Sequence, residues 1–498
     1  MKSLPLRSSV VDSAARERNI KRLRESGTVL PKFSELADPA SIPAAIKDDL
    51  TLIDPDTSHP LNLFRVHWYN SSRDRSIAGL PDHLVLPPSL TGTEATILVL
   101  FGDRFPMIRA HKVLAAYACL APRIVSGQFD LTRNRAVWPS TGNFCRGGVA
   151  ISRILGCRGV AVLPAGMSVE RFRWLEKWAT NPNDVVRTPG TESNVKEIYD
   201  ACAALSRDPQ NVIFNQFAEY GNYLVHYRCT GSAIGRAYES LAATDKSLRL
   251  RAFVAASGSA GTLAAGDYLK DEYGSVTVAV EALECPTLLN NGYGDHHIQG
   301  IGDKHVPLIH NVMNTDVVTA VSDRSTDSLN VLFNSPVGRE FLSTRRAVPE
   351  EVIGQLGSFG LSSICNVIAA IKTAKYYRLG ASDVIATVAT DGAEMYVSEV
   401  EKTLATRFNG RFDSVDAAGV YGQHILGAST DHLLELTRRD RERIFNLGYF
   451  TWVEQQGTSL QEFEARASQT FWRDLQELVP AWDAMIEEAN AEAAVTAV

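Results

Sequence analysis

The 498-residue sequence contains no Cys-x-x-Cys pair, and its seven cysteines are an odd number. This pattern argues against a disulfide framework and a zinc ribbon, and it is typical of reduced thiols in a cytoplasmic protein. No run of about 18 apolar residues occurs, and residues 1–23 lack the apolar centre of a signal peptide. We therefore expect a soluble, cytoplasmic protein that makes no contact with a membrane.

The chain also lacks a strong excess of charge, because its formal net charge is only −7. Without a basic stripe to neutralise phosphates, we expect no nucleic-acid partner. Histidines occur at positions 296, 297, 305 and 310, but their spacing matches no common zinc pattern, so no metal site is predicted. Hydrophobic residues make up 45% of the chain, which is enough to build a sizeable core.

Between residues 95 and 395, short β-branched runs alternate with segments of helical period. The expected strands are 96–101, 159–163, 184–187, 211–215, 252–256, 276–281 and 384–390, and the clearest helices are 112–120, 147–155, 169–180 and 195–205. Such alternation predicts βαβ units, with mostly parallel sheets and helices on both faces. Residues 1–90 are irregular apart from a charged helix near 11–25, whereas residues 412–490 predict amphipathic helices without strands.

Three segments have the composition of a ligand site. The turn Gly258-Ser259-Ala260-Gly261-Thr262 follows a buried strand and precedes a helix, where backbone N–H groups favour an anion such as phosphate. A tight turn without a ligand would have the same composition. A dinucleotide fingerprint is excluded because Ala260 and Leu263 stand where it requires glycine.

The other two segments contain a lysine and a polar loop. Lys112 begins a helix after the strand at 96–101, and a lysine there is usually at the surface; if desolvated, its amine can form a Schiff base. The loop Ser140-Thr141-Gly142-Asn143 offers hydroxyls, an amide and N–H groups at a helix start, which suits an anionic oxygen.

Together these segments resemble the fold-type II pyridoxal-phosphate enzymes, in particular the cysteine synthase and cystathionine β-synthase branch. The family places a Ser/Thr-x-Gly-Asn loop about thirty residues after its Schiff-base lysine. Further motifs follow here in family order, at 167–171 (MSVER), 188–190 (TPG), 215–217 (NQF), 258–262 (GSAGT), 296–302 (HHIQGIG), 360–363 (GLSS) and 391–396 (DGAEMY). The resemblance covers residues 60–396.

The resemblance implies a two-lobed α/β fold, a three-layer αβα arrangement with mostly parallel sheets like that of the tryptophan synthase β chain, plus an all-helical C-terminal extension. The implied units are an N-terminal arm (1–90), a large cofactor lobe (91–115 and 233–397), a small mobile substrate lobe (116–232) and the extension (398–498). Family members are usually two-fold dimers, so the resemblance also implies a homodimer.

It also implies roles for individual residues. Lys112 would carry pyridoxal 5′-phosphate as a Schiff base and shuttle protons, Asn143 would bond the phenolic oxygen, and Ser362 would face the pyridine nitrogen. The phosphate would lie on Gly258, Ser259, Ala260, Gly261 and Thr262, and the substrate would be held by Ser140, Thr141, Gly142, Gln216 and Gly300.

The implied activity is that of a lyase or synthase acting on a β-substituted L-amino acid through an aminoacrylate, by β-replacement or β-elimination. A dehydratase or ammonia-lyase of a hydroxy- or diamino acid is an alternative, and a non-catalytic scaffold is another. The sequence departs from the family at Phe144, where a small threonine is usual, and around Lys112, where Ala110-His111-Lys112-Val113-Leu114 replaces Ser-x-Lys-Asp-Arg. Because of these departures, the resemblance does not identify the substrate.

Overall fold

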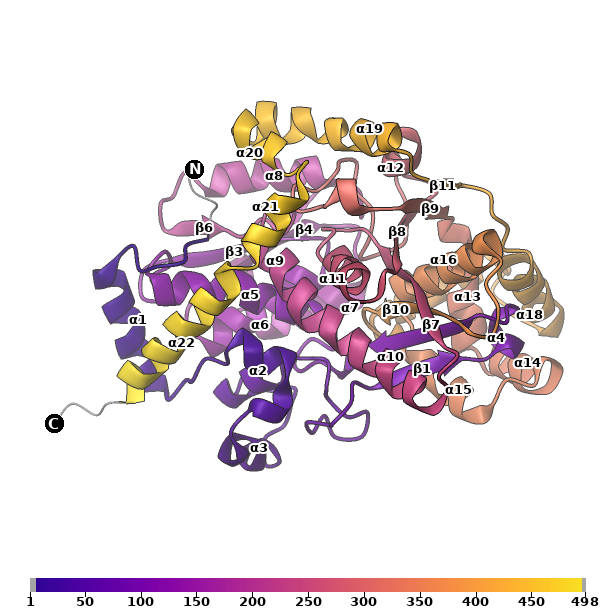
Figure 1. Ribbon diagram of the computed structural model, residues 1–498, viewed down its shortest axis with the longest axis horizontal. Coiled ribbons are helices and arrows are strands. Elements are labelled where there is room, and N and C mark those ends of the chain that lie inside the picture. Colours follow the sequence, from indigo (N-terminus) through magenta and orange to yellow (C-terminus); the bar gives the residue numbers. More distant parts are fainter. Residues whose placement is uncertain (1–5, 495–498) are drawn as a thin grey trace.

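The computed structural model describes residues 6–494, which form two mostly parallel β-sheets flanked by helices (Figure 1). The strands are β1 (His83–Leu86), β2 (Thr96–Phe101), β3 (Arg135–Pro139), β4 (Arg158–Pro164), β5 (Val185–Thr188), β6 (Asn211–Ile213), β7 (Arg249–Ala256), β8 (Val276–Ala282), β9 (Val317–Val321), β10 (Asp383–Ala389) and β11 (Leu433–Glu435).

The α-helices lie between and after these strands. They are α1 (Ser13–Ser26), α2 (Phe33–Ala37), α3 (Ala44–Leu50), α4 (Pro88–Thr91), α5 (Lys112–Ser126), α6 (Asn143–Ile154), α7 (Val169–Trp178), α8 (Val195–Leu205), α9 (Tyr220–Val225), α10 (Ser232–Thr244), α11 (Leu263–Tyr273), α12 (Thr287–Asn290), α13 (Asp323–Asn334), α14 (Pro336–Arg346), α15 (Glu350–Gln355), α16 (Leu361–Tyr377), α17 (Val397–Arg407), α18 (Ser414–Tyr421), α19 (Arg438–Tyr449), α20 (Leu460–Ala465), α21 (Gln469–Leu475) and α22 (Leu478–Ala494).

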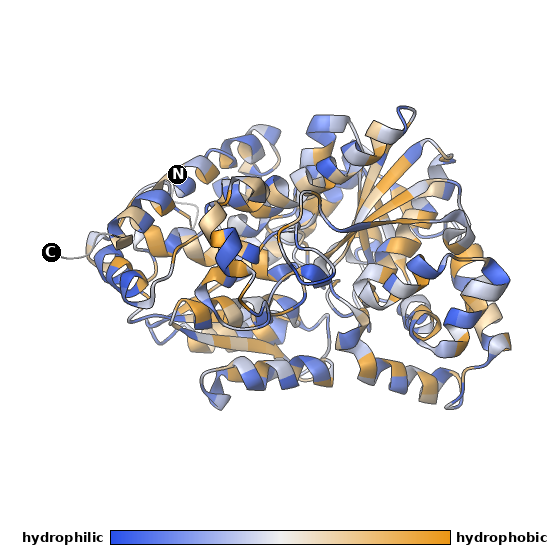
Figure 2. Ribbon diagram, turned by 90° about the horizontal axis from the view of Figure 1, so that it is seen from below, coloured by the Kyte–Doolittle hydropathy of each residue, from blue (hydrophilic) through white to orange (hydrophobic). Residues whose placement is uncertain are grey.

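The larger sheet has the order β1-β2-β10-β7-β8-β9-β11. Its five inner strands are parallel, and only the edge strands β1 and β11 run antiparallel to their neighbours. Side chains alternate along β7, so that Phe253 and Ala255 join the core with α11 whereas Ala252 and Val254 join the core with α16. Two apolar faces explain why the inner strands are mostly hydrophobic, and many of their residues are orange in Figure 2.

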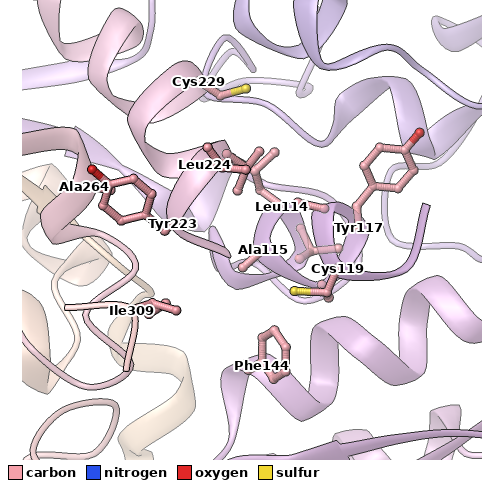
Figure 3. Packing of buried hydrophobic residues seen from close by; sticks show 14 of the residues in the cluster. Leu114, Ala115, Tyr117, Cys119, Phe144, Tyr223, Leu224, Cys229, Ala264 and Ile309 are labelled. Carbon is pink, nitrogen blue, oxygen red and sulfur yellow. The ribbon is translucent and has the colours of Figure 1, made fainter. Parts of the chain in front are cut away.

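The smaller sheet has the order β5-β4-β3-β6, and all its strands are parallel. Helix α6 packs against β3 and β4 on one face, and α8 packs against the other face through Ile198 and Cys202. The three-layer αβα arrangement is therefore confirmed in both sheets. Helix α5 lies against both α6 and α9, and Figure 3 shows Cys119 and Ala115 of α5 near Phe144 of α6.

The C-terminal helices pack onto the rest of the chain rather than standing apart from it. Helix α22 lies along α1 and α5 (Figure 1), and Trp482 is 1% exposed. Trp452 and Trp472 are also buried, as expected from their amphipathic spacing. One prediction needs correcting: the extension is not all-helical, because Leu433–Glu435 forms β11 against the otherwise unpaired edge of β9.

All seven expected strands and all four expected helices are present, with ends displaced by a few residues. The sequence analysis missed β1, β3 and β9, and the charged helix expected near 11–25 is α1. Within residues 6–494, none of the helices combines the length and the apolar character that crossing a membrane requires.

Candidate active site

Lys112 is the first residue of α5 and follows the loop that leaves β2. Its Nζ donates a hydrogen bond to Ser259 Oγ at 3.0 Å, so it reaches the turn after β7. Desolvation lowers the pKa of the Lys112 amine from 10.5 to about 8, and the nearby charge of Asp303 opposes that shift. The amine is therefore easier to deprotonate than an ordinary surface lysine.

The turn between β7 and α11 has an open row of backbone donors. Among the residues that the structure describes, the amides of Ser259, Ala260 and Thr262 donate to no protein acceptor. Helix α11 starts directly after them, so its positive dipole end faces the same place. A methyl group on Gly261 would overlap Asn222 Oδ1, whereas Ala260 adopts a left-handed φ of 64°. The backbone of this turn therefore allows an anion to approach its free N–H groups closely.

Two adjoining cavities collect the residues that the sequence analysis selected. The first has about 370 Å³ of empty volume, and the predicted residues in its lining are Lys112, Ser140, Thr141, Asn143, Gln216, Gly258, Ser259 and Gly300. The second has about 340 Å³ and is lined by Lys112 together with the whole turn 258–262. Residues 150 positions apart in the sequence are therefore neighbours around one amine.

Ser362 and Gly142 lie outside both linings. Ser362 is the second residue of α16, and its buried Oγ has no hydrogen-bond partner within the described residues. A methyl group on Gly300 would come within 3.7 Å of that oxygen, which places Ser362 behind the cavity wall. Gly142 precedes α6 with a φ of 153°, and a side chain there would overlap Arg171.

Asn143 belongs to a buried polar network as well as to the cavity. Its Nδ2 donates to Asp391 Oδ2 at 2.7 Å, and its Oδ1 accepts from Arg146 at 3.0 Å. Asp391 Oδ2 also accepts from the Tyr396 hydroxyl at 2.8 Å and lies 3.6 Å from Arg171. This network fixes the amide while leaving one of its N–H groups for a ligand.

Two carboxyl groups in the first cavity escaped the sequence analysis. Glu192 and Asp303 both line it, and burial raises the pKa of Glu192 to about 7 and that of Asp303 well above its usual range. Each lies close to a recognised motif: Glu192 is two residues after Thr-Pro-Gly, and Asp303 directly follows Gly-Ile-Gly. That adjacency was the available signal.

The bulky and sulfur-containing side chains of α6 have packing roles. Phe144 is 1% exposed, lines the first cavity and meets Trp138 edge to face at 5.4 Å. Cys145 is buried, and desolvation raises the pKa of its thiol to about 12, so it packs as a small hydrophobic side chain. Residues 6–494 bring no three His, Cys, Asp or Glu side chains together in a metal-binding group.

The cavity fits pyridoxal phosphate on three independent observations. The turn 258–262 offers amides and a helix start to a phosphate, and Lys112 offers a desolvated amine to an aldehyde. Next to Gly300 of the lining, the buried Ser362 hydroxyl lacks the partner that a ring nitrogen could supply. Glu192 and Asp303 disfavour an anion on their side of the cavity. The turn 258–262 is therefore the part of the cavity that suits a phosphate.

Comparisons with known proteins agree with this fit. A family model described as pyridoxal-phosphate dependent enzyme matches residues 103–330. Cysteine synthase B of Campylobacter jejuni is 30% identical over 256 residues, covering 50% of this chain and 75% of the relative. Cysteine synthase 3 of Caenorhabditis elegans is 27% identical over 295 residues, covering 59% and 77%.

A solved structure with the same fold is a hydrogen sulfide-producing enzyme from Fusobacterium nucleatum. It has a TM-score of 0.54 and 19% identity, covering 67% of this chain and 99% of the other. The chain belongs to the family of pyridoxal-phosphate-dependent enzymes, and within it to the cysteine synthase-like members of fold type II.

Proposed function

We propose that this protein uses pyridoxal phosphate to act on a β-substituted L-amino acid, by replacing or eliminating the group on the β-carbon. The observation that carries the proposal is the desolvated Lys112 amine, bonded to Ser259 of the turn 258–262 and shared by both cavities. Relatives named cysteine synthase support this class of chemistry.

The cofactor, when bound, supplies an electron-withdrawing ring that acidifies the α-carbon of an attached amino acid. We propose that Lys112 Nζ, with a pKa of about 8, takes and returns the proton at that carbon. Ser259 Oγ keeps the amine at the cavity, and the turn 258–262 fixes the phosphate. These residues hold the reacting groups in one place.

The polar loop before α6 is the proposed substrate carboxylate site. Ser140 and Thr141 line the cavity with Gln216, and together they offer hydroxyl and amide donors without adding a positive charge. Gly142 leaves room beside Arg171, and Gly300 forms part of the opposite lining. Asn143 would give its remaining N–H to the phenolic oxygen of the cofactor.

Ser362 directs the choice among reactions. A neutral hydroxyl facing the ring nitrogen does not hold that nitrogen protonated as a carboxylate would. With the cofactor bound, Ser362 would leave its electron withdrawal weaker than a carboxylate would, which would favour early loss of the β leaving group over transamination.

We also propose how the molecule is organised and where it works. Residues 116–232 would form a small lobe that closes over the substrate, against a large lobe made of 91–115 and 233–397, with residues 1–90 as an arm and 398–498 as an extension. Closure would exclude water from the cavity. We propose a cytoplasmic homodimer, which light scattering after size-exclusion chromatography would test.

An activity screen tests the proposed function. The purified protein, loaded with pyridoxal phosphate, is mixed with O-acetylserine, cysteine or serine, with and without an added nucleophile. β-Elimination predicts release of pyruvate and ammonia, and β-replacement predicts consumption of the nucleophile into a new amino acid. Turnover of hydroxy- or diamino acids alone would instead identify a dehydratase or ammonia-lyase, and absence of turnover with bound cofactor would indicate a scaffold.

A further inference from the structure

Glu192 and Asp303 meet at the cavity that contains Lys112, although 111 positions separate them in the sequence. Glu192 lies in the loop after β5 and is 1% exposed, and Asp303 lies in the loop after α12 and is 7% exposed. Buried carboxyl groups are rare without partners, so a pair of them in a ligand cavity needs an explanation.

Hydrogen bonds within the protein occupy only some of the carboxyl oxygens of Glu192 and Asp303. Glu192 Oε1 accepts the Gly300 N–H at 2.7 Å, which fixes the side chain beside the cavity. Within residues 6–494, Glu192 Oε2 and Asp303 Oδ2 are buried and lack a hydrogen-bond partner. Glu281 shows the contrast: it is equally buried, but both its oxygens accept backbone N–H groups, from Leu288 and Leu289, at 2.8 Å. Glu281 is structural, whereas the pair keeps acceptor oxygens available.

The surrounding charges allow the pair to retain negative charge. Burial raises the pKa of both groups; the charge of Glu192 raises that of Asp303 further, and the charge of Asp391 does the same at Glu192, where the Thr141 hydroxyl acts in the opposite direction. The positive charges of Arg171, near Glu192, and of Lys112, near Asp303, oppose this effect. With a pKa of about 7, Glu192 is partly ionised at neutral pH and becomes the charged acceptor of the pair at higher pH.

Such acceptors are unsuited to the carboxylate of the amino-acid substrate, because like charges would repel. The α-amino group of that substrate is also accounted for, since the proposed function joins it to the cofactor. The remaining reactant is the molecule that attacks the β-carbon. Unpaired buried oxygens favour a reactant that donates hydrogen bonds to them.

We propose that Glu192 and Asp303 form the binding subsite for the second substrate, and that they select an uncharged or cationic hydrogen-bond donor, such as an amine or hydroxyl compound, over an anionic thiolate. This inference rests on the proposed function and adds its nucleophile class. Asp303 and Glu192 act by accepting hydrogen bonds from the donor and by repelling anions such as hydrosulfide.

The test uses the amide variants Asp303→Asn and Glu192→Gln, which keep the shape and remove the charge. The loaded enzyme first receives O-acetylserine, and acetate release reports the first half of the reaction. Hydrosulfide and pyrazole, an uncharged N–H donor that forms neither an imine nor an oxime with the cofactor, then compete for the second half, and chromatography gives the product ratio. The competition is run above pH 8, where Glu192 with its pKa of about 7 is ionised, and there the loss of its charge should shift that ratio toward hydrosulfide by about tenfold or more.

A second readout does not depend on turnover. In the loaded protein without amino acid, the fluorescence of the bound cofactor is quenched by caesium or by iodide. In the wild type, caesium should quench the cofactor fluorescence more strongly than iodide does. In both variants, quenching by caesium should weaken and quenching by iodide should strengthen. Asp295→Asn is the matched control, because Asp295 lies between the same two loops, bonded to Ser193 and Lys304, but is 63% exposed; it should change neither readout.

The two hypotheses fail in different ways. If wild-type protein binds no cofactor or releases no acetate, the proposed function is wrong and this inference falls with it. If acetate is released normally but product ratio and quenching are the same in wild type, Asp303→Asn and Glu192→Gln, only the inference is overturned. Equal shifts in Asp295→Asn would also overturn it, because a general surface charge would then explain the selectivity.

Discussion

Desolvation has the largest influence on the Lys112 amine, and it lowers the pKa of that group from 10.5 to about 8. Only the deprotonated amine attacks an aldehyde, so the rate at which apoprotein binds pyridoxal phosphate should rise with pH and level off above about pH 8. Stopped-flow absorbance measures this rate. A rate that continues to rise toward pH 10.5 would mean that Lys112 behaves as an ordinary exposed lysine.

The buried hydroxyl of Ser362 predicts opposite effects in the two forms of the protein. Without the cofactor, Ser362→Ala removes a buried polar group that has no partner, so the apoprotein should be as stable as wild type or more stable. With the cofactor, the same change loses one hydrogen bond, about 1 kcal/mol of binding free energy. Thermal unfolding and cofactor titration separate the two effects. Equal destabilisation of both forms would contradict the proposed contact with the ring nitrogen.

At the scale of the element, the phosphate turn offers a matched pair of substitutions. Gly261→Ala adds a methyl group that overlaps Asn222, so it should weaken cofactor binding by about tenfold or more, the equivalent of 1.4 kcal/mol. Ala260→Gly removes a methyl group from a left-handed position and relieves about 1–2 kcal/mol of backbone strain. Isothermal titration gives both affinities. Equal affinities for the two variants would show that the phosphate does not lie on this turn.

The C-terminal extension stabilises the loop that carries Asp303. Trp452 Nε1 donates to Val306 O at 2.7 Å, and the Trp452 ring lies 5.7 Å from His305. Trp452→Ala should cost about 3–5 kcal/mol of stability and also raise KM for the second substrate. Phe450→Ala is the control, because Phe450 is 69% exposed on the same turn and should change neither. Chemical denaturation and initial-rate kinetics measure the two effects.

For the whole molecule, the alternation of strands and helices was enough to predict the αβα layers, because fully buried parallel strands are hydrophobic throughout. The missed strand β3 ends in Pro139, and a proline argues against a central strand. The missed strands β1 and β9 lie at or next to an edge of the larger sheet, where pairing with a neighbour defines a short strand. The edge strand β11 is three residues long and exists through pairing with β9, which no local pattern reveals.

The same limit applies to the site. Position at a helix start made Lys112 and the turn 258–262 candidates, the resemblance of the ordered motifs predicted their roles, and the structure places Lys112 Nζ 3.0 Å from Ser259 Oγ. The sequence signals Glu192 and Asp303 only by their position beside recognised motifs, and their proximity depends on how the loops after β5 and α12 fold together. Their raised pKa values are a property of the folded molecule, since burial causes them.

The most direct test of the account is to locate the covalent bond to the cofactor. Pyridoxal phosphate is added to the purified protein, the imine is reduced with borohydride, and the labelled peptide is identified by mass spectrometry. The account predicts a single label on Lys112, absent from Lys112→Ala and retained in Lys372→Met, a variant of another buried lysine. A label on any other lysine, or on none, would contradict it.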